Sequence, residues 1–242
     1  MRLRGGTHLT VESLVLSGHE LLVPSEEVPE GYRVHGERGG VTFIGPWANR
    51  LRDGAPEGAP TDPNGVPIHG LPGDWVVDGE TAVGRYDWPV PHALRVRFVL
   101  RERSLTVETE LRADRPVPVA FGWHPYVRPP GERAAWVLEQ PSRVALELDE
   151  RGLPTGGREH RPAESAPLGD RTFDDAFAGL PDDAAWACGG VEVRHLNGFP
   201  AAQLFAPGDC DLVGIEPQTA PVDGWRTTMR ATWARAVWRL SA

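Results

Sequence analysis

Apolar and polar residues alternate with a period of two over several short stretches of this chain. The clearest are residues 94–100 and 105–111, which are separated by a turn at 102–104, and similar alternation recurs at 144–148, 191–193 and 234–240. In a strand, successive side chains point to opposite faces, so these stretches predict antiparallel strands with one buried and one solvated face. The first two stretches predict a hairpin.

Helical periodicity is almost missing from the sequence. Only residues 174–180 and 131–138 predict a helical turn or two, and the 28 glycines and 24 prolines are scattered among apolar stretches. Residues 53–67 and 152–171 are rich in Gly and Pro and are interpreted as surface loops of one domain. The pattern predicts an all-β fold, a large antiparallel β-sandwich that spans residues 1–242 as a single domain.

Composition excludes several function classes. The chain has 25 basic and 34 acidic residues, a formal net charge of −9, which argues against nucleic acid or an anionic membrane as partner. All basic residues are arginines, so Schiff-base lysine chemistry and a P-loop lysine are excluded. Cys188 and Cys210 form no disulfide framework or zinc-ligand spacing. No signal peptide or membrane span is recognisable, so a cytoplasmic protein of undetermined oligomeric state is expected.

Two residues far apart in the sequence are candidates for acid–base chemistry. His124 lies among aromatic residues before Pro125, which disfavours helical backbone at His124. Glu216 is expected at the end of an apolar strand, where Pro217 would stop the strand ladder. If they meet in the fold, they form a general acid and a general base without a metal or cofactor. Each residue alone is more often structural than catalytic.

Other polar residues lie in turns that follow apolar segments. Arg50, which follows Asn49, offers a planar fork of donors either to substrate oxygens or to a surface acid. His69 lies in a turn bounded by Pro and Gly, and Asp174 is interpreted either as a ligand-binding residue or as a helix N-cap. The eight histidines match no metal-binding motif, and no Gly-x-Ser-x-Gly elbow occurs. No metal site is predicted.

Taken in chain order, five stretches resemble the aldose 1-epimerase (galactose mutarotase) family. These stretches are Gly45-Pro46-Trp47-Ala48-Asn49-Arg50, Ile68-His69-Gly70, His124-Pro125-Tyr126, Asp174-x-x-Phe177 and Glu216-Pro217-Gln218. No single stretch is specific, but their order is. The resemblance implies a large antiparallel β-sandwich, in agreement with the strand pattern.

The resemblance also implies an activity and a set of site residues. Glu216 would be the general base and His124 the general acid in opening and closing a sugar ring, so that the α and β anomers of an aldose interconvert. Substrate-binding residues would be Arg50, His69, Asp174, Asn49 and Gln218. The implied partner is a small-molecule sugar, and no cofactor is implied.

Some positions depart from the family pattern, and rival functions remain open. Leu71, Val127 and Gly224-Trp225 stand where the family usually has other residues, and these departures are expected to shape the sugar pocket. One rival is anomerisation of a hexose 6-phosphate, with Arg128 or Arg226 at the pocket rim. Others are a non-catalytic sugar-binding domain and a polysaccharide lyase or hydrolase, of which a hydrolase needs a second suitably placed carboxylate.

Overall fold

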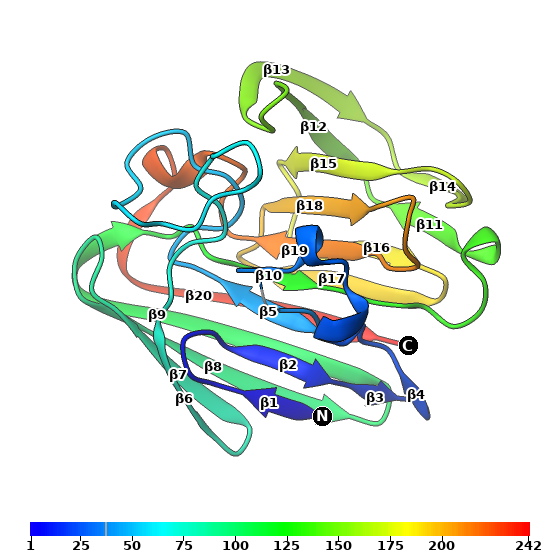
Figure 1. Cartoon of the computed structure of the whole chain (residues 1–242), viewed down its shortest axis with the longest axis horizontal. Coiled ribbons are helices and arrows are strands. Elements are labelled where there is room, and N and C mark those ends of the chain that lie inside the picture. Colours follow the sequence, from blue (N-terminus) through cyan, green and yellow to red (C-terminus); the bar gives the residue numbers. More distant parts are fainter. Residues whose placement is uncertain (37) are drawn as a thin grey trace.

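The computed structural model describes residues 1–36 and 38–242, which fold mainly into strands. Two large antiparallel sheets face each other, and loops and short helical turns cover the outer face of one of them (Figure 1). The large antiparallel β-sandwich expected from the strand pattern is therefore confirmed. Within the described residues, no helix is long and apolar enough to span a membrane.

The strands are arranged as follows. Sheet A has the order β1 (Arg2–Arg4), β2 (Thr10–Ser13), β5 (Val41–Ile44), β10 (Gly122–Pro125), β19 (Gly214–Gln218), β18 (Ala201–Ala206), β15 (Phe173–Ala178), β12 (Arg143–Leu148) and β13 (Pro154–Arg161). Sheet B has the order β14 (Glu164–Pro167), β11 (Val137–Gln140), β16 (Ala184–Cys188), β17 (Val191–Asn197), β20 (Arg230–Ser241), β9 (Ser104–Pro118), β8 (His92–Arg101), β7 (Thr81–Tyr86) and β6 (Asp74–Asp78).

Shorter elements complete the fold. β3 (Val15–Leu16) pairs with β4 (His19–Glu20), and the 3-10 helices are η1 (Ser25–Glu27), η2 (Glu30–Tyr32), η3 (Arg133–Ala135) and η4 (Gly224–Arg226). η3 lies inside residues 131–138, where the sequence predicts a helical turn. The segment with η1 and η2, dark blue in Figure 1, crosses the outer face of sheet A.

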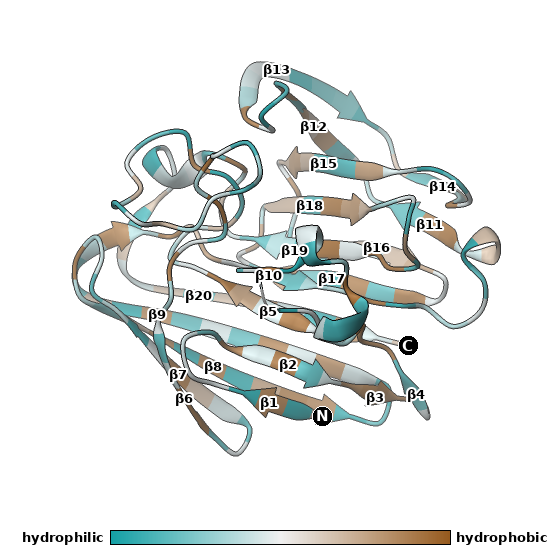
Figure 2. Cartoon of the chain, viewed as in Figure 1, coloured by the Kyte–Doolittle hydropathy of each residue, from teal (hydrophilic) through white to brown (hydrophobic). Residues whose placement is uncertain are grey.

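The predicted hairpin is confirmed as β8 and β9. Its register pairs Leu94 with Leu111 and Arg101 with Ser104. Leu94, Val96 and Phe98 are fully buried, whereas Arg95 and Arg97 between them are exposed. Figure 2 shows the same alternation as brown and teal bands along the strands. The period of two thus places one face of sheet B in the core.

The core lies between the two sheets and is rich in aromatic rings. Trp123 of β10 contacts Phe98 of β8 and Trp238 of β20, with ring centroids 6.0 and 6.1 Å apart. Its indole Nε1 donates a hydrogen bond to Thr109 Oγ1 of β9 at 3.1 Å, so the buried N–H is satisfied. Because Trp123 points into the core, its neighbour His124 points to the outer face of sheet A.

Three expectations from the sequence are wrong. Residues 174–180 are not helical, because β15 runs through Ala178 and turns Asp174 and Phe177 to opposite faces. Residues 152–171 are not loop alone but contain β13 and β14. Pro217 does not stop β19, which continues to Gln218. Pro217 lies opposite Ala202 of β18, and the pairing of β18 with β19 continues to Gln218.

Candidate active site

A cavity of about 600 Å³ opens on the outer face of sheet A. Its floor is formed by side chains of the neighbouring strands β10, β19, β18 and β15, and its walls by residues 30–36, 49–50, 60–64 and 68–69. This volume lies within the range of small-molecule sites. The site is therefore assembled from segments spread over most of the chain.

His124 and Glu216 meet on the cavity floor. His124 Nε2 lies 3.1 Å from Glu216 Oε1, and both side chains are almost fully buried. The other carboxylate oxygen, Oε2, accepts a hydrogen bond from Gln218 Nε2 at 3.2 Å. The two residues are 92 positions apart in the sequence and meet because β10 and β19 are adjacent strands.

Burial shifts the pKa values of both residues of this pair. It lowers the pKa of His124 to about 3, and it raises the pKa of Glu216 well above its usual value. The charge on Asp174 raises the pKa of Glu216 further, while the Gln218 hydrogen bond and Arg50 oppose this. Both directions favour uncharged forms, because charge is poorly solvated in the interior. Because the two side chains are in contact, the protonation of one affects the other, and they titrate as a coupled unit.

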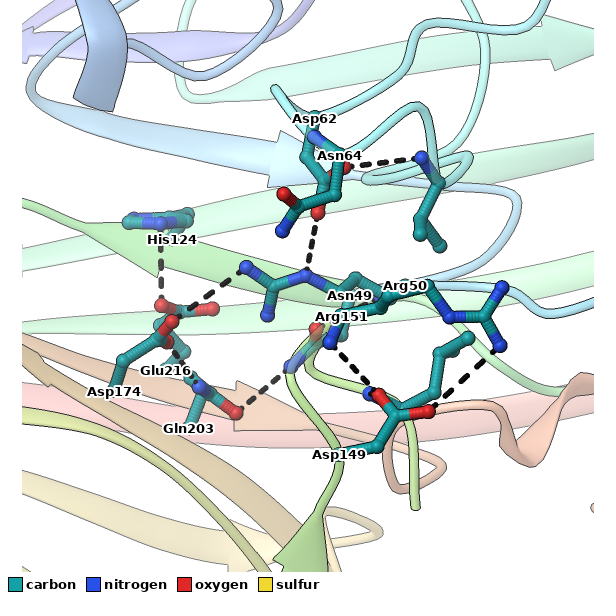
Figure 3. A network of polar contacts seen from close by, with 12 residues as sticks. Asn49, Arg50, Asp62, Asn64, His124, Asp149, Arg151, Asp174, Gln203 and Glu216 are labelled. Atoms are coloured by element: carbon teal, nitrogen blue, oxygen red, sulfur yellow. Dashed lines mark hydrogen bonds and ion pairs between the residues drawn. The ribbon is translucent and has the colours of Figure 1, made fainter. Parts of the chain in front are cut away.

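Arg50 links the two sides of the cavity through ion pairs (Figure 3). Its Nε donates to Asp62 Oδ2 at 2.8 Å, and its Nη2 lies 3.5 Å from Asp174 Oδ2. Asp62 is held in turn by the backbone N–H groups of Asn64 and Val66. The guanidinium is therefore fixed in orientation while its edge faces the cavity.

An amide chain connects Asn49 to Asp174 across the floor. Asn49 Oδ1 accepts from the backbone N–H of Arg50 at 2.8 Å, and Asn49 Nδ2 donates to Gln203 Oε1 at 2.8 Å. Gln203 Nε2 then donates to Asp174 Oδ1 at 2.5 Å. Because a backbone N–H can only donate and a carboxylate can only accept, the orientation of both amides is fixed. Asp174 thus receives donors on both of its oxygens.

His69 lines the cavity from a turn that packs closely against the backbone of Gly45. Its own backbone has a φ of +61°, and Gly70 has a φ of +85°. A Cβ on Gly70 would clash with the carbonyl of Gly45, so the Ile-His-Gly stretch requires glycine here. The His69 ring lies edge-on to His124 at 5.2 Å between centroids. Burial lowers the pKa of His69 well below its usual value.

Tyr126, the third residue of the His-Pro-Tyr stretch, holds the covering segment in place. Its hydroxyl donates to the backbone carbonyl of Tyr32 in η2, and burial raises the pKa of Tyr126 well above its usual value. Tyr32 Oη is also bonded to Asp209 Oδ2 at 3.2 Å. The segment that carries η2 is therefore fastened to sheet A beside the catalytic candidates.

The structure brings most of the residues singled out from the sequence to one place. Glu216, His124, Arg50, His69, Asp174 and Asn49 line the cavity, whereas Gln218 lies behind Glu216 and supports its carboxylate. Sequence reasoning missed further lining residues, among them Tyr32, His35, Asp62, Gln203 and Phe205. Gln203 and Phe205 carried no signal in the sequence, because their place in the cavity depends on β18 lying beside β19 in sheet A.

The departures from the family pattern lie away from the cavity. Leu71 and Trp225 pack in a separate cluster with Trp47, and Val127 belongs to the main core. None of the three is among the described residues that line the cavity, so they do not shape it directly, contrary to expectation. In the described ranges, no group of three His, Cys, Asp or Glu residues could hold a metal ion.

Comparisons with known proteins agree with this architecture. A family model of aldose 1-epimerase matches residues 6–230. The fold is similar to that of galactose 1-epimerase from Lactobacillus acidophilus, with a TM-score of 0.69, 19% identity and coverage of 96% of this chain and 87% of that one. No curated protein sequence matches the chain.

Two further solved structures have the same fold. A galactose mutarotase-like protein from Clostridium acetobutylicum gives a TM-score of 0.68 at 14% identity, covering 98% of this chain and 92% of that one. An aldose epimerase homologue from C. elegans gives a TM-score of 0.65 at 15% identity, again covering 98% of this chain and 92% of that one. At such low identities these similarities establish the fold alone.

Proposed function

The chain belongs to the aldose 1-epimerase family, and we propose that it interconverts the α and β anomers of a free aldose without a cofactor. The observation that carries the proposal is the 3.1 Å contact between His124 Nε2 and Glu216 Oε1 on the floor of a cavity of about 600 Å³, which is large enough for a monosaccharide. A paired acid and base is what ring opening requires, since one oxygen loses a proton while another gains one.

The proposed reaction has two mirror-image halves. Glu216 takes the proton from the anomeric hydroxyl as His124 gives one to the ring oxygen. The bond between C1 and the ring oxygen breaks, and a C1 carbonyl forms. Rotation about C1–C2 presents the other carbonyl face, and the two residues reverse their roles as the ring closes. Each half leaves the number of protons on the pair unchanged.

In this cycle His124 and Glu216 together hold one proton throughout. Glu216 as base requires the ionised tautomer, with a carboxylate beside an imidazolium, and Arg50 favours it by lowering the pKa of Glu216. Burial favours the neutral tautomer, which is the state the pair reaches when the sugar is open. Because the two tautomers contain the same number of protons, moving between them needs no exchange with solvent.

The remaining cavity residues are proposed to bind the sugar. Arg50 and His69 would stabilise charge that develops on the ring oxygen, and Asp174 would accept hydrogen bonds from sugar hydroxyls. Asn49 would fix Gln203, and through it Asp174, by the amide chain. Gln218 would hold Glu216 in position.

Gly152 offers a test of the role of Arg50. A Cβ there would lie 2.6 Å from Nη1 and 2.7 Å from Cζ of Arg50. We expect Gly152→Ala to displace the guanidinium and lower kcat/KM for anomerisation roughly 10- to 100-fold, the effect of losing one charged hydrogen bond. Gly156→Ala is the matched control, because Gly156 also has positive φ but no atom within 4 Å of the added Cβ. Equal kcat/KM in both variants would contradict a role for Arg50.

Charge at the cavity favours a free aldose over a sugar phosphate. The lining residues include four acids (Glu30, Asp62, Asp174 and Glu216) and two arginines (Arg33 and Arg50). Arg50 is already paired with two of these acids. Arg128 and Arg226 are not among the described lining residues, and Arg128 is bonded to Glu27 at 2.7 Å. A phosphate dianion would therefore enter a cavity of net negative charge.

Polarimetry on freshly dissolved α anomers tests the function. We expect the protein to accelerate the mutarotation of α-glucose or α-galactose, with kcat/KM for glucose 6-phosphate at least roughly tenfold lower because of the repulsion. Anomer signals in NMR spectra provide an independent readout. If glucose 6-phosphate turned over faster than either free sugar, the hexose 6-phosphate alternative would be favoured. If the protein accelerated the mutarotation of none of the three sugars, the epimerase function would be contradicted for them.

A further inference from the structure

One wall of the cavity is supplied by a segment that carries none of the stretches resembling the family. Residues 30–36 contribute Glu30, Gly31, Tyr32, Arg33, His35 and Gly36 to the lining. Among them, His35 carries the third imidazole of the cavity, besides His69 and His124. A wall of this kind, placed over the acid–base pair, can select among sugars without taking part in the chemistry.

The His35 ring is held rigidly. It stacks on His8, with centroids 3.9 Å apart and planes inclined by 12°. Its backbone lies in the left-handed region with a φ of 52°, and the turn is closed by a hydrogen bond from Gly36 N to Arg33 O at 3.0 Å. Ring plane and backbone are thus both fixed before any ligand binds, which lowers the entropic cost of binding.

The described residues give the His35 ring no hydrogen bond, and its Nδ1 is enclosed without a partner. Because Nδ1 is enclosed, it cannot reach a ligand in the cavity. Nε2 is not among the enclosed atoms and has no hydrogen bond to a described residue, so this nitrogen is free to bind a ligand there. Burial, followed by the charges of His8, Arg38 and His124, lowers the pKa of His35 to about 3. The neutral ring has one donor and one acceptor, which matches a hydroxyl group.

We propose that His35 is a substrate-binding residue that hydrogen-bonds one hydroxyl of the sugar and thereby sets which aldoses bind. The inference rests on the proposed function, because it assumes that a sugar occupies the cavity. A hydroxyl is favoured over a metal ion, since the described histidines and acids form no group able to hold one. It is favoured over an anion, since the ring is neutral.

His35→Phe separates hydrogen bonding from packing. Phenylalanine keeps a flat ring to stack on His8 but removes both nitrogens. We expect KM for the best aldose to rise about tenfold and kcat to stay within about threefold, the effect of one lost hydrogen bond to a bound hydroxyl. His35→Gln, which keeps a donor and an acceptor, should restore KM to within about threefold of the wild type. His92→Phe is the control, since the His92 ring is likewise stacked on another ring, that of Tyr86, but does not line the cavity.

Monodeoxy analogues of that aldose identify the hydroxyl. For the analogue that lacks the group bound by His35, wild type and His35→Phe should have the same KM, whereas the other analogues should keep the difference. An unchanged KM in His35→Phe, or the same rise for every analogue, would overturn the proposal. If the wild type anomerises no aldose, the proposed function fails as well. If it does and His35→Phe behaves identically, only the role of His35 fails.

Discussion

Replacing Glu216 by glutamine should reduce kcat for anomerisation by roughly 10²–10⁴-fold, the range for losing a general acid–base group. Glutamine has nearly the shape of glutamate and can still bond to Gln218 and to His124, so the fold and sugar binding should persist. It cannot take up or release a proton. The loss should therefore appear in kcat, measured by polarimetry at saturating sugar, with KM within a few-fold of the wild type.

Two comparisons make this result specific. Glu159→Gln removes a carboxylate from the exposed strand β13 and should leave kcat unchanged. The double variant with His124→Gln should lose little beyond the single variants, because residues that act as a unit are not additive. If Glu216→Gln kept wild-type kcat, another group would be the acid–base partner of His124.

The sequence predicted that His124 and Glu216 could meet, and the structure places them in contact. Strand pattern and the bounding prolines place His124 and Glu216 in extended backbone, and the order of the five family-like stretches indicates which residues converge. The distance between the two side chains could not be predicted, because it depends on β10 and β19 becoming neighbours in sheet A. Only long-range pairing of strands fixes that order.

The errors at β15 and β13 have different causes. In β15 the period of two is present, with Phe173 and Phe177 toward the core and Asp174 toward the cavity, but the adjacent acids Asp174 and Asp175 imitate a helix cap. β13 is an edge strand with two glycines and few apolar residues, so it shows no periodicity. Its strand form depends on pairing with β12, which local sequence does not encode.

The missed cavity residues show the other limit of sequence reasoning. Asp62 lies in a Gly- and Pro-rich loop without periodicity, yet it orients Arg50 through a 2.8 Å hydrogen bond. Gln203 is an amide in an apolar strand, where the usual expectation is a structural role. Its importance arises only because β18 lies between β19 and β15, so that its side chain bridges Asn49 and Asp174.

The buried histidines have a consequence for stability in mild acid. Burial lowers the pKa of His35 and His124 to about 3 and that of His195 to about 4. In the unfolded chain a histidine titrates near pH 6.5, so below that pH the unfolded state binds more protons and becomes favoured. These histidines therefore do not destabilise the fold at neutral pH, but the free energy of unfolding decreases as the pH falls below about 6.5.

The size of this loss follows from the same linkage. Between pH 7 and pH 5, a buried imidazole with a pKa of about 3 or 4 lowers the free energy of unfolding by about 2 kcal/mol. The pKa of His69 is also lowered by burial, so this residue acts in the same direction. Glu216 acts in the opposite direction, because its raised pKa makes the folded state gain protons as the pH falls. Because the lowered histidine pKa values outnumber the one raised carboxylate pKa, we expect a net loss of stability between pH 7 and pH 5.

Denaturant unfolding at pH 7, 6 and 5 measures this loss directly. His195 gives a test that is independent of activity, because it lies in β17, outside the cavity, with its Nδ1 2.9 Å from the carbonyl oxygen of Phe199. In His195→Gln the drop in unfolding free energy between pH 7 and pH 5 should be smaller by about 2 kcal/mol. His160→Gln, on exposed β13, should show the wild-type drop, because water solvates that ring in both states. A wild-type protein equally stable at pH 7 and pH 5 would mean that the buried imidazoles accept protons without unfolding, and that hydration or a carboxylate partner compensates their charge inside the fold.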